Sequence, residues 1–217
     1  MPNSSPKSLN GKLRSSLHAA FRARARRNSN LWLVYSYKTD RDWLVSGDHQ
    51  LVHWIMFLEA CPDVKTYSLI ENPGDLEADG ILGYPEALVT YKGLRQEVHI
   101  IVDDLDDSAK AGRRESFEFR YFTHADLKAS AKTASRWLRV IAFAAGVRGR
   151  DLSEANHAVV YLVHQRRSGT LKGVLDDLSH LDSTAVLGVL ARLAITGVLR
   201  LDLSQCSFGL DSHWEVA

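Results

Sequence analysis

Two histidines spaced four residues apart are the first side chains in this sequence that suggest chemistry. His49 and His53 fall in a stretch expected to be helical, where this spacing places both imidazoles on one face, as in metal sites. The three residues between them include no glutamate, and His99 is the only other histidine nearby in the inferred sheet. We therefore interpret the pair as partly buried and structural.

Other motifs with a defined chemistry are missing from the sequence. The acidic run at residues 103–107 lacks the spacing, the glycine and the terminal glutamate of an EF-hand, and it is typical of a solvated turn. Neither GxxxxGK[ST] nor GxGxxG occurs, so nucleotide binding has no support. Cys61 and Cys206 are isolated, which suits a reducing cytoplasm, and no Ser/His/Asp or Cys/His arrangement indicates nucleophilic catalysis.

Charge is strongly segregated along the chain, although the net charge is only +1. Residues 1–41 and 108–150 are basic, whereas residues 71–107 are acidic, and basic flanks of this kind can bind a polyanion such as duplex DNA. The alternatives are intramolecular neutralisation and, for the N-terminal segment, a flexible solubilising arm. On a helix, the four cations from residue 128 to residue 139 would form one stripe. The side chains predicted to contact DNA are Lys12, Arg14, Arg22, Arg24, Arg26, Arg27, Arg113, Arg114, Lys128, Lys132, Arg136 and Arg139.

The elements that must position these side chains alternate between helix and strand in the first half of the chain. Residues 7–27 predict a basic amphipathic helix, and residues 48–60 predict a nearly buried helix. A capping box at Thr123 predicts a third helix that runs to about Gly146. Strands are predicted by the β-like runs at residues 30–37, 64–69, 87–92, 97–102 and 117–122. This order predicts an α/β fold, a mixed sheet flanked by helices.

From about residue 151 the pattern changes to a series of helices. Three helices followed by a terminal hairpin are the order of a winged helix-turn-helix. In the third helix, within residues 182–197, Arg192 is the only basic residue. A helix that reads bases in a major groove carries several polar or cationic side chains, so this helix is better suited to packing or to docking a protein partner.

A framework of short motifs runs through the middle of the chain. It consists of DWLVSGDHQLVHWIMFLEACPDVKTY, followed by IENP, GYPEALVTY and EVHIIVDD. This framework resembles the amino-terminal part of TnsA-type transposon endonucleases, which belong to the restriction-endonuclease-like nucleases. The resemblance covers roughly residues 30–125, and residues 126–217 look like the winged-helix carboxyl half of the same proteins. Because that half engages the transposon's ATPase regulator, the resemblance implies an ATPase or transposase partner for residues 151–217.

The resemblance also implies where a metal site would lie, and this chain departs from the family's metal-site pattern at several positions. Two-metal phosphodiester hydrolysis needs converging carboxylates and a base or lysine that orients the attacking water. Glu86 stands where the family has its metal-binding aspartate, but Ile101 stands at the position of the second acid and Asp103 at that of the lysine. A shifted register would bring Asp103 or Asp104 to a metal without restoring the lysine. The residues that mark the vestigial or rearranged site are Asp48, His49, Glu86, Asp103 and Asp104.

These observations predict a catalytically inactive, TnsA-like protein that binds double-stranded DNA or takes part in the assembly of a mobile genetic element. We expect a basic helical arm (1–29), a nuclease-fold domain (30–125) and a winged-helix-like domain (126–217), without a cofactor. One alternative is a Mg²⁺- or Mn²⁺-dependent DNA endonuclease with a rearranged acidic site. Another is an interaction subunit that docks an ATPase without touching DNA. With no apolar run long enough for a membrane span and no secretory signal, a cytoplasmic protein is expected.

Overall fold

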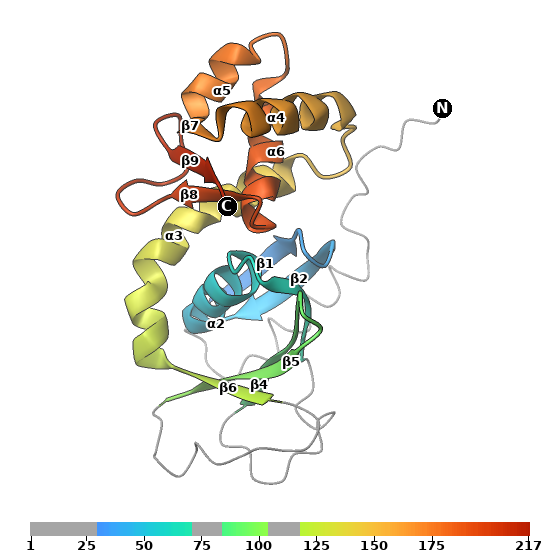
Figure 1. Ribbon diagram of the computed structural model, residues 1–217. Helices are drawn as coiled ribbons and strands as arrows, with labels where there is room; N and C mark the ends of the chain where they lie inside the picture. Colours follow the sequence, from blue (N-terminus) through green and yellow to red (C-terminus); the bar gives the residue numbers. More distant parts are fainter. Residues whose placement is uncertain (1–29, 71–83, 104–117) are drawn as a thin grey trace.

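The computed structural model describes residues 30–70, 84–103 and 118–217, whose strands form a two-stranded, a four-stranded and a three-stranded sheet (Figure 1). The strands are β1 (Leu31–Ser36), β2 (Arg41–Ser46), β3 (Val64–Leu69), β4 (Tyr84–Tyr91), β5 (Gln96–Val102), β6 (Glu118–Thr123), β7 (Ser168–Thr170), β8 (Leu199–Asp202) and β9 (His213–Val216). The helices are α2 (Asp48–His53), the π-helix η1 (Trp54–Glu59), α3 (His124–Gly146), α4 (Ser153–Arg166), α5 (Leu171–Asp177) and α6 (Ser183–Ile195).

The four-stranded sheet has the order β3-β4-β5-β6 and is mixed. Its first three strands are antiparallel neighbours, and β6 runs parallel to β5. The helical segment α2–η1 precedes the sheet in sequence and α3 follows it. The predicted α/β class, a mixed sheet flanked by helices, is confirmed. The predicted helix at residues 7–27 lies outside the described residues.

A hairpin of β1 and β2 precedes α2, and the sequence predicted only its first strand. The two strands pair antiparallel from Leu31 opposite Ser46 to Ser36 opposite Arg41. In β2, Trp43 and Val45 are buried while Arg41 is exposed, which is the alternation of a half-buried strand. That pattern is present in the sequence, but it is short and adjoins the polar turn TDRD at residues 39–42, and no element was predicted for residues 43–47.

The long helix α3 connects the lower and upper parts of the molecule (Figure 1). It begins with the predicted capping box: the backbone N–H of Asp126 donates to Thr123 Oγ1 over 3.1 Å, and the backbone N–H of Thr123 donates to Asp126 Oδ2 over 3.1 Å. These bonds satisfy two backbone donors that a helix N-terminus otherwise leaves unpaired. The capping box therefore determines where the cations of α3 begin.

The C-terminal part has the element order α4-β7-α5-α6-β8-β9 and closes with an antiparallel sheet of order β7-β9-β8. The three helices and the terminal strands were predicted, whereas the short strand β7 was not. At the N-terminus of α6, the side chain of Asp182 accepts from the backbone N–H of Thr184 over 2.9 Å and so caps the helix. Gly197 follows α6 with a φ of 77°, and a Cβ there would lie 2.4 Å from Pro62 Cβ. This glycine therefore permits both the left-handed turn and the close approach to the end of η1.

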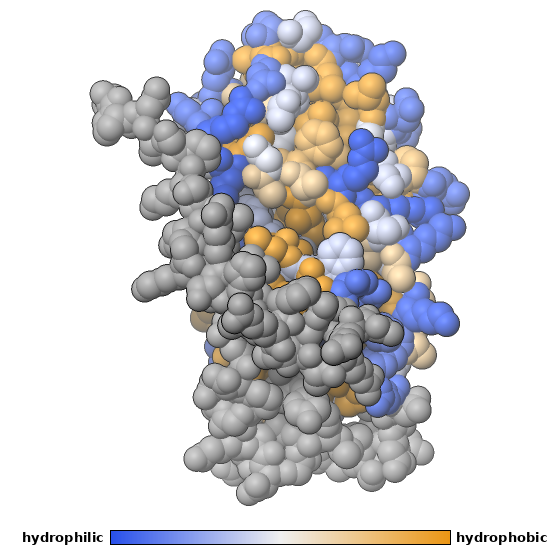
Figure 2. All heavy atoms as spheres, turned by 180° about the vertical axis from the view of Figure 1, so that it is seen from behind, coloured by the Kyte–Doolittle hydropathy of each residue, from blue (hydrophilic) through white to orange (hydrophobic). Residues whose placement is uncertain are grey.

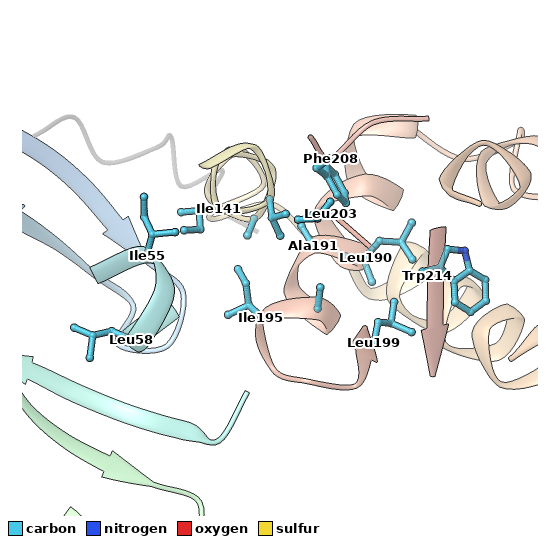
Figure 3. Close-up of a cluster of buried hydrophobic side chains, with 14 of the residues drawn as sticks. Ile55, Leu58, Ile141, Leu190, Ala191, Ile195, Leu199, Leu203, Phe208 and Trp214 are labelled. Atoms are coloured by element: carbon cyan, nitrogen blue, oxygen red, sulfur yellow. The ribbon is translucent and has the colours of Figure 1, made fainter. Parts of the chain in front are cut away.

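One buried apolar cluster extends through both parts of the molecule. Ile55 from η1, Ile141 from α3 and Ile195 from α6 face one another, and the cluster continues to Phe208 and Trp214 (Figure 3). The expected boundary near residue 125 thus coincides with the start of α3 but does not divide this core. A smaller cluster of Val98, Ile100 and Val102 lies on the other face of β5.

The surface seen from behind shows apolar side chains along the middle of the upper part and hydrophilic ones at its borders (Figure 2). Within the described ranges, none of the helices combines the length and the apolar character that crossing a membrane requires.

Candidate functional site

One corner of the four-stranded sheet is formed by the start of α2, strand β4, the end of β5 and the start of α3. These elements carry the described residues that the sequence predicted to mark a vestigial or rearranged site. Glu86 lies on β4 at a register shift between Pro85 and Ala87, which is typical of a β-bulge. The side-chain amide of Gln50 donates to Glu86 Oε2 over 2.6 Å. Burial raises the pKa of Glu86 above its ordinary value, and the bond from Gln50 partly offsets this effect.

Gln50 was missed by the sequence analysis, which looked for an acid on this helix. Its side-chain oxygen accepts from the backbone N–H of Ser46 over 2.8 Å and from Ser46 Oγ over 2.6 Å. The amide is therefore oriented from the β2 side and presents its nitrogen to Glu86. A hydrogen-bond donor occupies the helix position that faces Glu86, and a donor cannot share a cation with a carboxylate.

Asp48, the first residue of α2, is hydrogen-bonded to side chains at the start of the chain's described part. Its Oδ1 accepts from Asn30 Nδ2 over 3.0 Å and from Trp32 Nε1 over 3.3 Å, which ties the start of the helix to β1. Gly47 precedes it with a φ of 83°. These contacts give Asp48 a structural role in this arrangement.

His49 stacks on His124, the first residue of α3, with the ring centroids 4.0 Å apart and the planes inclined by 22°. His124 Nδ1 lies 3.0 Å from Asp103 Oδ1, just after β5. Burial, followed by the nearby charge of His124, lowers the pKa of His49. The structure thus brings His49 and Asp103 together through His124, which the sequence analysis did not single out. Asp104 lies outside the described residues.

The side of β5 that faces α2 carries Glu97, His99 and Ile101 at alternating positions. Ile101 therefore extends this side toward the corner with an apolar side chain. Among the described residues, no three His, Cys, Asp or Glu side chains are arranged to hold a metal ion.

His53 and His99 belong to a buried polar network behind this corner. His53 Nε2 lies 3.0 Å from His99 Nδ1, and His99 Nε2 lies 3.3 Å from Glu97 Oε2. The hydroxyl of Tyr91 donates to the same Glu97 oxygen over 2.6 Å. A consistent assignment has His53 donating to His99 and His99 donating to Glu97, both rings being neutral. His49 and His53 thus turn to different partners, and the structural interpretation of this pair fits the geometry.

Helix α3 carries the predicted basic stripe, and three of its four cations are exposed: Lys128, Lys132 and Arg139. Arg136 differs, because its guanidinium donates to the main-chain carbonyl groups of Leu203, Ser204 and Gln205. Arg136 therefore connects α3 to the loop after β8. Fewer of its N–H groups are left to contact a phosphate than the predicted stripe assumes. The other predicted DNA contacts, in the arm and at Arg113 and Arg114, lie outside the described residues.

Helix α6 is mostly buried, which agrees with its carrying a single basic side chain, Arg192. Its buried positions include Val186, Gly188, Leu190 and Ile195, and it packs against α3. A Cβ at Gly188 would lie 2.5 Å from Val147 Cγ1, so the end of α3 and α6 approach each other closely here. A helix held in this way cannot enter a DNA groove without unpacking the core.

Comparison of the chain with protein-family models, with curated proteins and with solved structures found no match.

Proposed function

We propose that this protein is a non-catalytic, duplex-DNA-binding component of a mobile-element assembly, built on a TnsA-type nuclease-like scaffold. The observation that carries the proposal is the exposed basic face of α3, defined by Lys128, Lys132 and Arg139. In an α-helix these positions fall within about 40° of one another and span about 16 Å along the axis. A rigid helix holds such charges at fixed spacing along a phosphate backbone without ordering a flexible arm on binding.

The order and directions of the strands support the scaffold part of the proposal. A helix, three antiparallel strands, a fourth parallel strand and a second helix follow one another, as the resemblance to the restriction-endonuclease-like nucleases leads one to expect. The corner at Glu86 supports the loss of catalysis. Gln50 supplies a donor where a metal site needs an acceptor, and Ile101 supplies no ligand.

The C-terminal part supports a winged-helix-like module that does not read bases. Its order α4-β7-α5-α6-β8-β9, with the sheet β7-β9-β8, corresponds to three helices and a three-stranded wing sheet. Because most of α6 is buried in the core, we assign DNA contact to α3. The exposed surface of residues 151–217 is then available to an ATPase or transposase partner.

Fluorescence anisotropy of a labelled duplex across a salt series, without divalent metal, tests DNA binding. We expect measurable affinity whose logarithm falls linearly with the logarithm of salt concentration. The variant K128Q/K132Q/R139Q should weaken binding and flatten the slope by roughly 2–3, since each lost phosphate contact removes about 0.9. Arg136 is left intact because it also holds the β8 loop.

The matched control is K65Q/K172Q/R200Q, which removes the same charge at three exposed positions outside α3. If both triple variants lose affinity equally, net charge explains the effect and the α3 interface is wrong. If the wild-type protein does not bind even at low salt, the interaction subunit without DNA contact replaces this proposal.

Nicking of supercoiled plasmid in Mg²⁺ and in Mn²⁺ tests the loss of catalysis. No cleavage above background is expected. Nicking that Glu86→Ala abolishes would instead establish the endonuclease alternative.

A further inference from the structure

A cavity of about 410 Å³ lies where the two parts of the molecule meet. Tyr37, just after β1, lines one side, the start of α4 lines another, and the C-terminal half of α6 forms the floor. Its volume is within the range of pockets that hold small organic ligands. It is separate from the corner at Glu86 and from the basic face of α3, because none of those residues lines it.

Arg192 is the residue of this cavity whose bonding is incomplete. It projects from α6, its guanidinium carbon lies 4.9 Å from the centre of the Tyr37 ring, and one terminal nitrogen donates to Ala144 O over 3.4 Å. Its Nε is buried and has no hydrogen-bond partner in the part of the chain that the structure describes. A partly buried guanidinium with neither a full set of hydrogen bonds nor a counter-ion is unfavourable, and an oxyanion in the cavity is the strongest partner that its charge can take.

The other charged groups of the cavity already have partners, an ion pair for Arg150 and hydrogen bonds for Asp151. Arg150 forms an ion pair with Asp182, and Asp151 accepts from the backbone N–H and the hydroxyl of Ser153 over 2.9 and 2.7 Å. Among the described residues, no carboxylate lies within ion-pair distance of Arg192. The Asp151 carboxylate is thus engaged by its own turn, and Arg192 is the cation of the lining that has no carboxylate partner among the described residues.

The cavity wall is not only polar. Leu152, Val189 and Leu193 line it together with the ring of Tyr37. A ligand that satisfies this lining carries an oxyanion at one end and an apolar or aromatic body at the other. Inorganic phosphate alone would leave the apolar wall in contact with water.

We propose that the cavity between Tyr37, α4 and α6 binds a small organic oxyanion, a carboxylate or a phosphate monoester on an apolar body, with Arg192 as the residue that pairs with the anionic group. This site is independent of DNA binding. Because its walls come from β1, α4 and α6, its occupation would couple the sheet part of the molecule to the C-terminal part.

Titrations of the ¹⁵N-labelled full-length protein with benzoate, phenyl phosphate and inorganic phosphate, followed by NMR, test the proposal. Saturable shifts centred on residues 150–156 and 189–196 are expected with the two aromatic anions, and weaker binding with inorganic phosphate. Equal affinity for inorganic phosphate and phenyl phosphate would overturn the apolar part of the site. No saturable shift with any of the three would overturn the site itself.

Arg192→Gln should reduce the affinity at least about tenfold, since it removes a charge-assisted hydrogen bond. Arg200→Gln is the matched control, because Arg200 is exposed on β8 and does not line the cavity. K128Q/K132Q/R139Q should bind the aromatic anions like the wild type, which separates this site from the DNA face.

Should Arg192→Gln fail to fold, Asn156→Trp tests the same site from its exposed rim on α4. The larger side chain should block binding while Arg192 remains in place. Unchanged binding in both variants would contradict the proposal.

Discussion

The sheet part of the molecule, from β1 to β6, and the C-terminal part, from α4 onward, have cores of different chemistry. The described residues of the sheet part bury the polar side chains of Ser36, His53, Glu59, Glu97 and His99, whereas those of the C-terminal part bury only Ser212 among such residues. Buried polar groups lower stability unless they are fully hydrogen-bonded. The comparison therefore separates a core whose stability depends on pH from a core whose stability depends on packing.

Glu59 shows how the sheet part satisfies a buried carboxylate. It accepts from Ser36 Oγ over 2.5 Å, from Tyr67 Oη over 2.8 Å and from the backbone N–H of Tyr37 over 3.3 Å. Burial nevertheless raises its pKa. Lys38 lies close by, where burial lowers its pKa to about 8 while its ammonium caps the carbonyl groups of Leu58 and Cys61.

The buried acids and histidines of the sheet part act on stability with opposite signs. Glu59 and Glu86 have raised pKa values, so the folded state binds protons more tightly and stability falls as pH rises through those values. His53 and His99 have lowered pKa values, that of His99 being about 4, because burial disfavours the charged ring. Their contribution is fully present above pH 6.5 and is lost as pH falls toward 4.

The largest expected effect comes from the packed part. Leu190→Ala removes a fully buried side chain of α6 and should lower the free energy of unfolding by about 3–4 kcal/mol. Urea unfolding at pH 5 and at pH 7.5 should give the same loss, since the side chain is removed from the apolar cluster. If the loss of stability differed strongly between the two pH values, the stability of the C-terminal core would also depend on titrating groups, contrary to the comparison above.

The next effect concerns the histidine network. His99→Gln keeps a donor for Glu97 but removes the titrating ring, so the loss of stability between pH 6.5 and 4 should be smaller than in the wild type by about 3 kcal/mol. Unfolding free energies across this pH range measure the difference, in which the opposing contributions of Glu59 and Glu86 cancel. If the unfolding free energies of the two proteins changed with pH in parallel, the pKa of His99 would be the same in the folded and unfolded states.

A smaller effect tests how tightly α6 is packed. Gly188→Ala would gain up to about 1 kcal/mol from helix propensity alone, but its Cβ meets both methyl groups of Val147 at 2.5 and 2.6 Å. We expect a net destabilisation of about 1–2 kcal/mol by thermal and urea unfolding. In a Val147→Ala variant, Gly188→Ala should lower the free energy of unfolding by less, or raise it. An equal loss of stability with and without Val147→Ala would rule out this contact as the cause.

The smallest effect concerns the corner at Glu86. Glu86→Gln removes a buried charge while an oxygen remains to accept from Gln50, so stability at pH 8 should rise by about 1 kcal/mol. The gain should shrink as the pH is lowered through the pKa of the folded state and past 4.5, the ordinary pKa of the carboxyl, because well below 4.5 the wild-type carboxyl is protonated in both states. A constant gain across this range would mean that the pKa of Glu86 is the same in the folded and unfolded states, so that burial does not shift it.

The sequence by itself determined most of the local structure. Strands β3 to β6, the capping box of α3 and the helices of the C-terminal part follow from alternation, helical periodicity and caps, which depend on residues close in sequence. It also predicted that the helix within residues 182–197, with Arg192 as its only basic side chain, is suited to packing or to docking a protein partner, and α6 is mostly buried. The strand β2 was missed only because its short alternation adjoins a polar turn.

Only the tertiary structure decided which side chains meet. That Gln50 rather than an acid faces Glu86, that His124 joins His49 to Asp103, and that Arg136 is engaged by the β8 loop all depend on contacts between distant elements. The cavity at Arg192 likewise forms only when β1, α4 and α6 pack together. Periodicity tells which face of an element is buried, but the partner across that face is set by packing of the whole chain, and no local pattern encodes it.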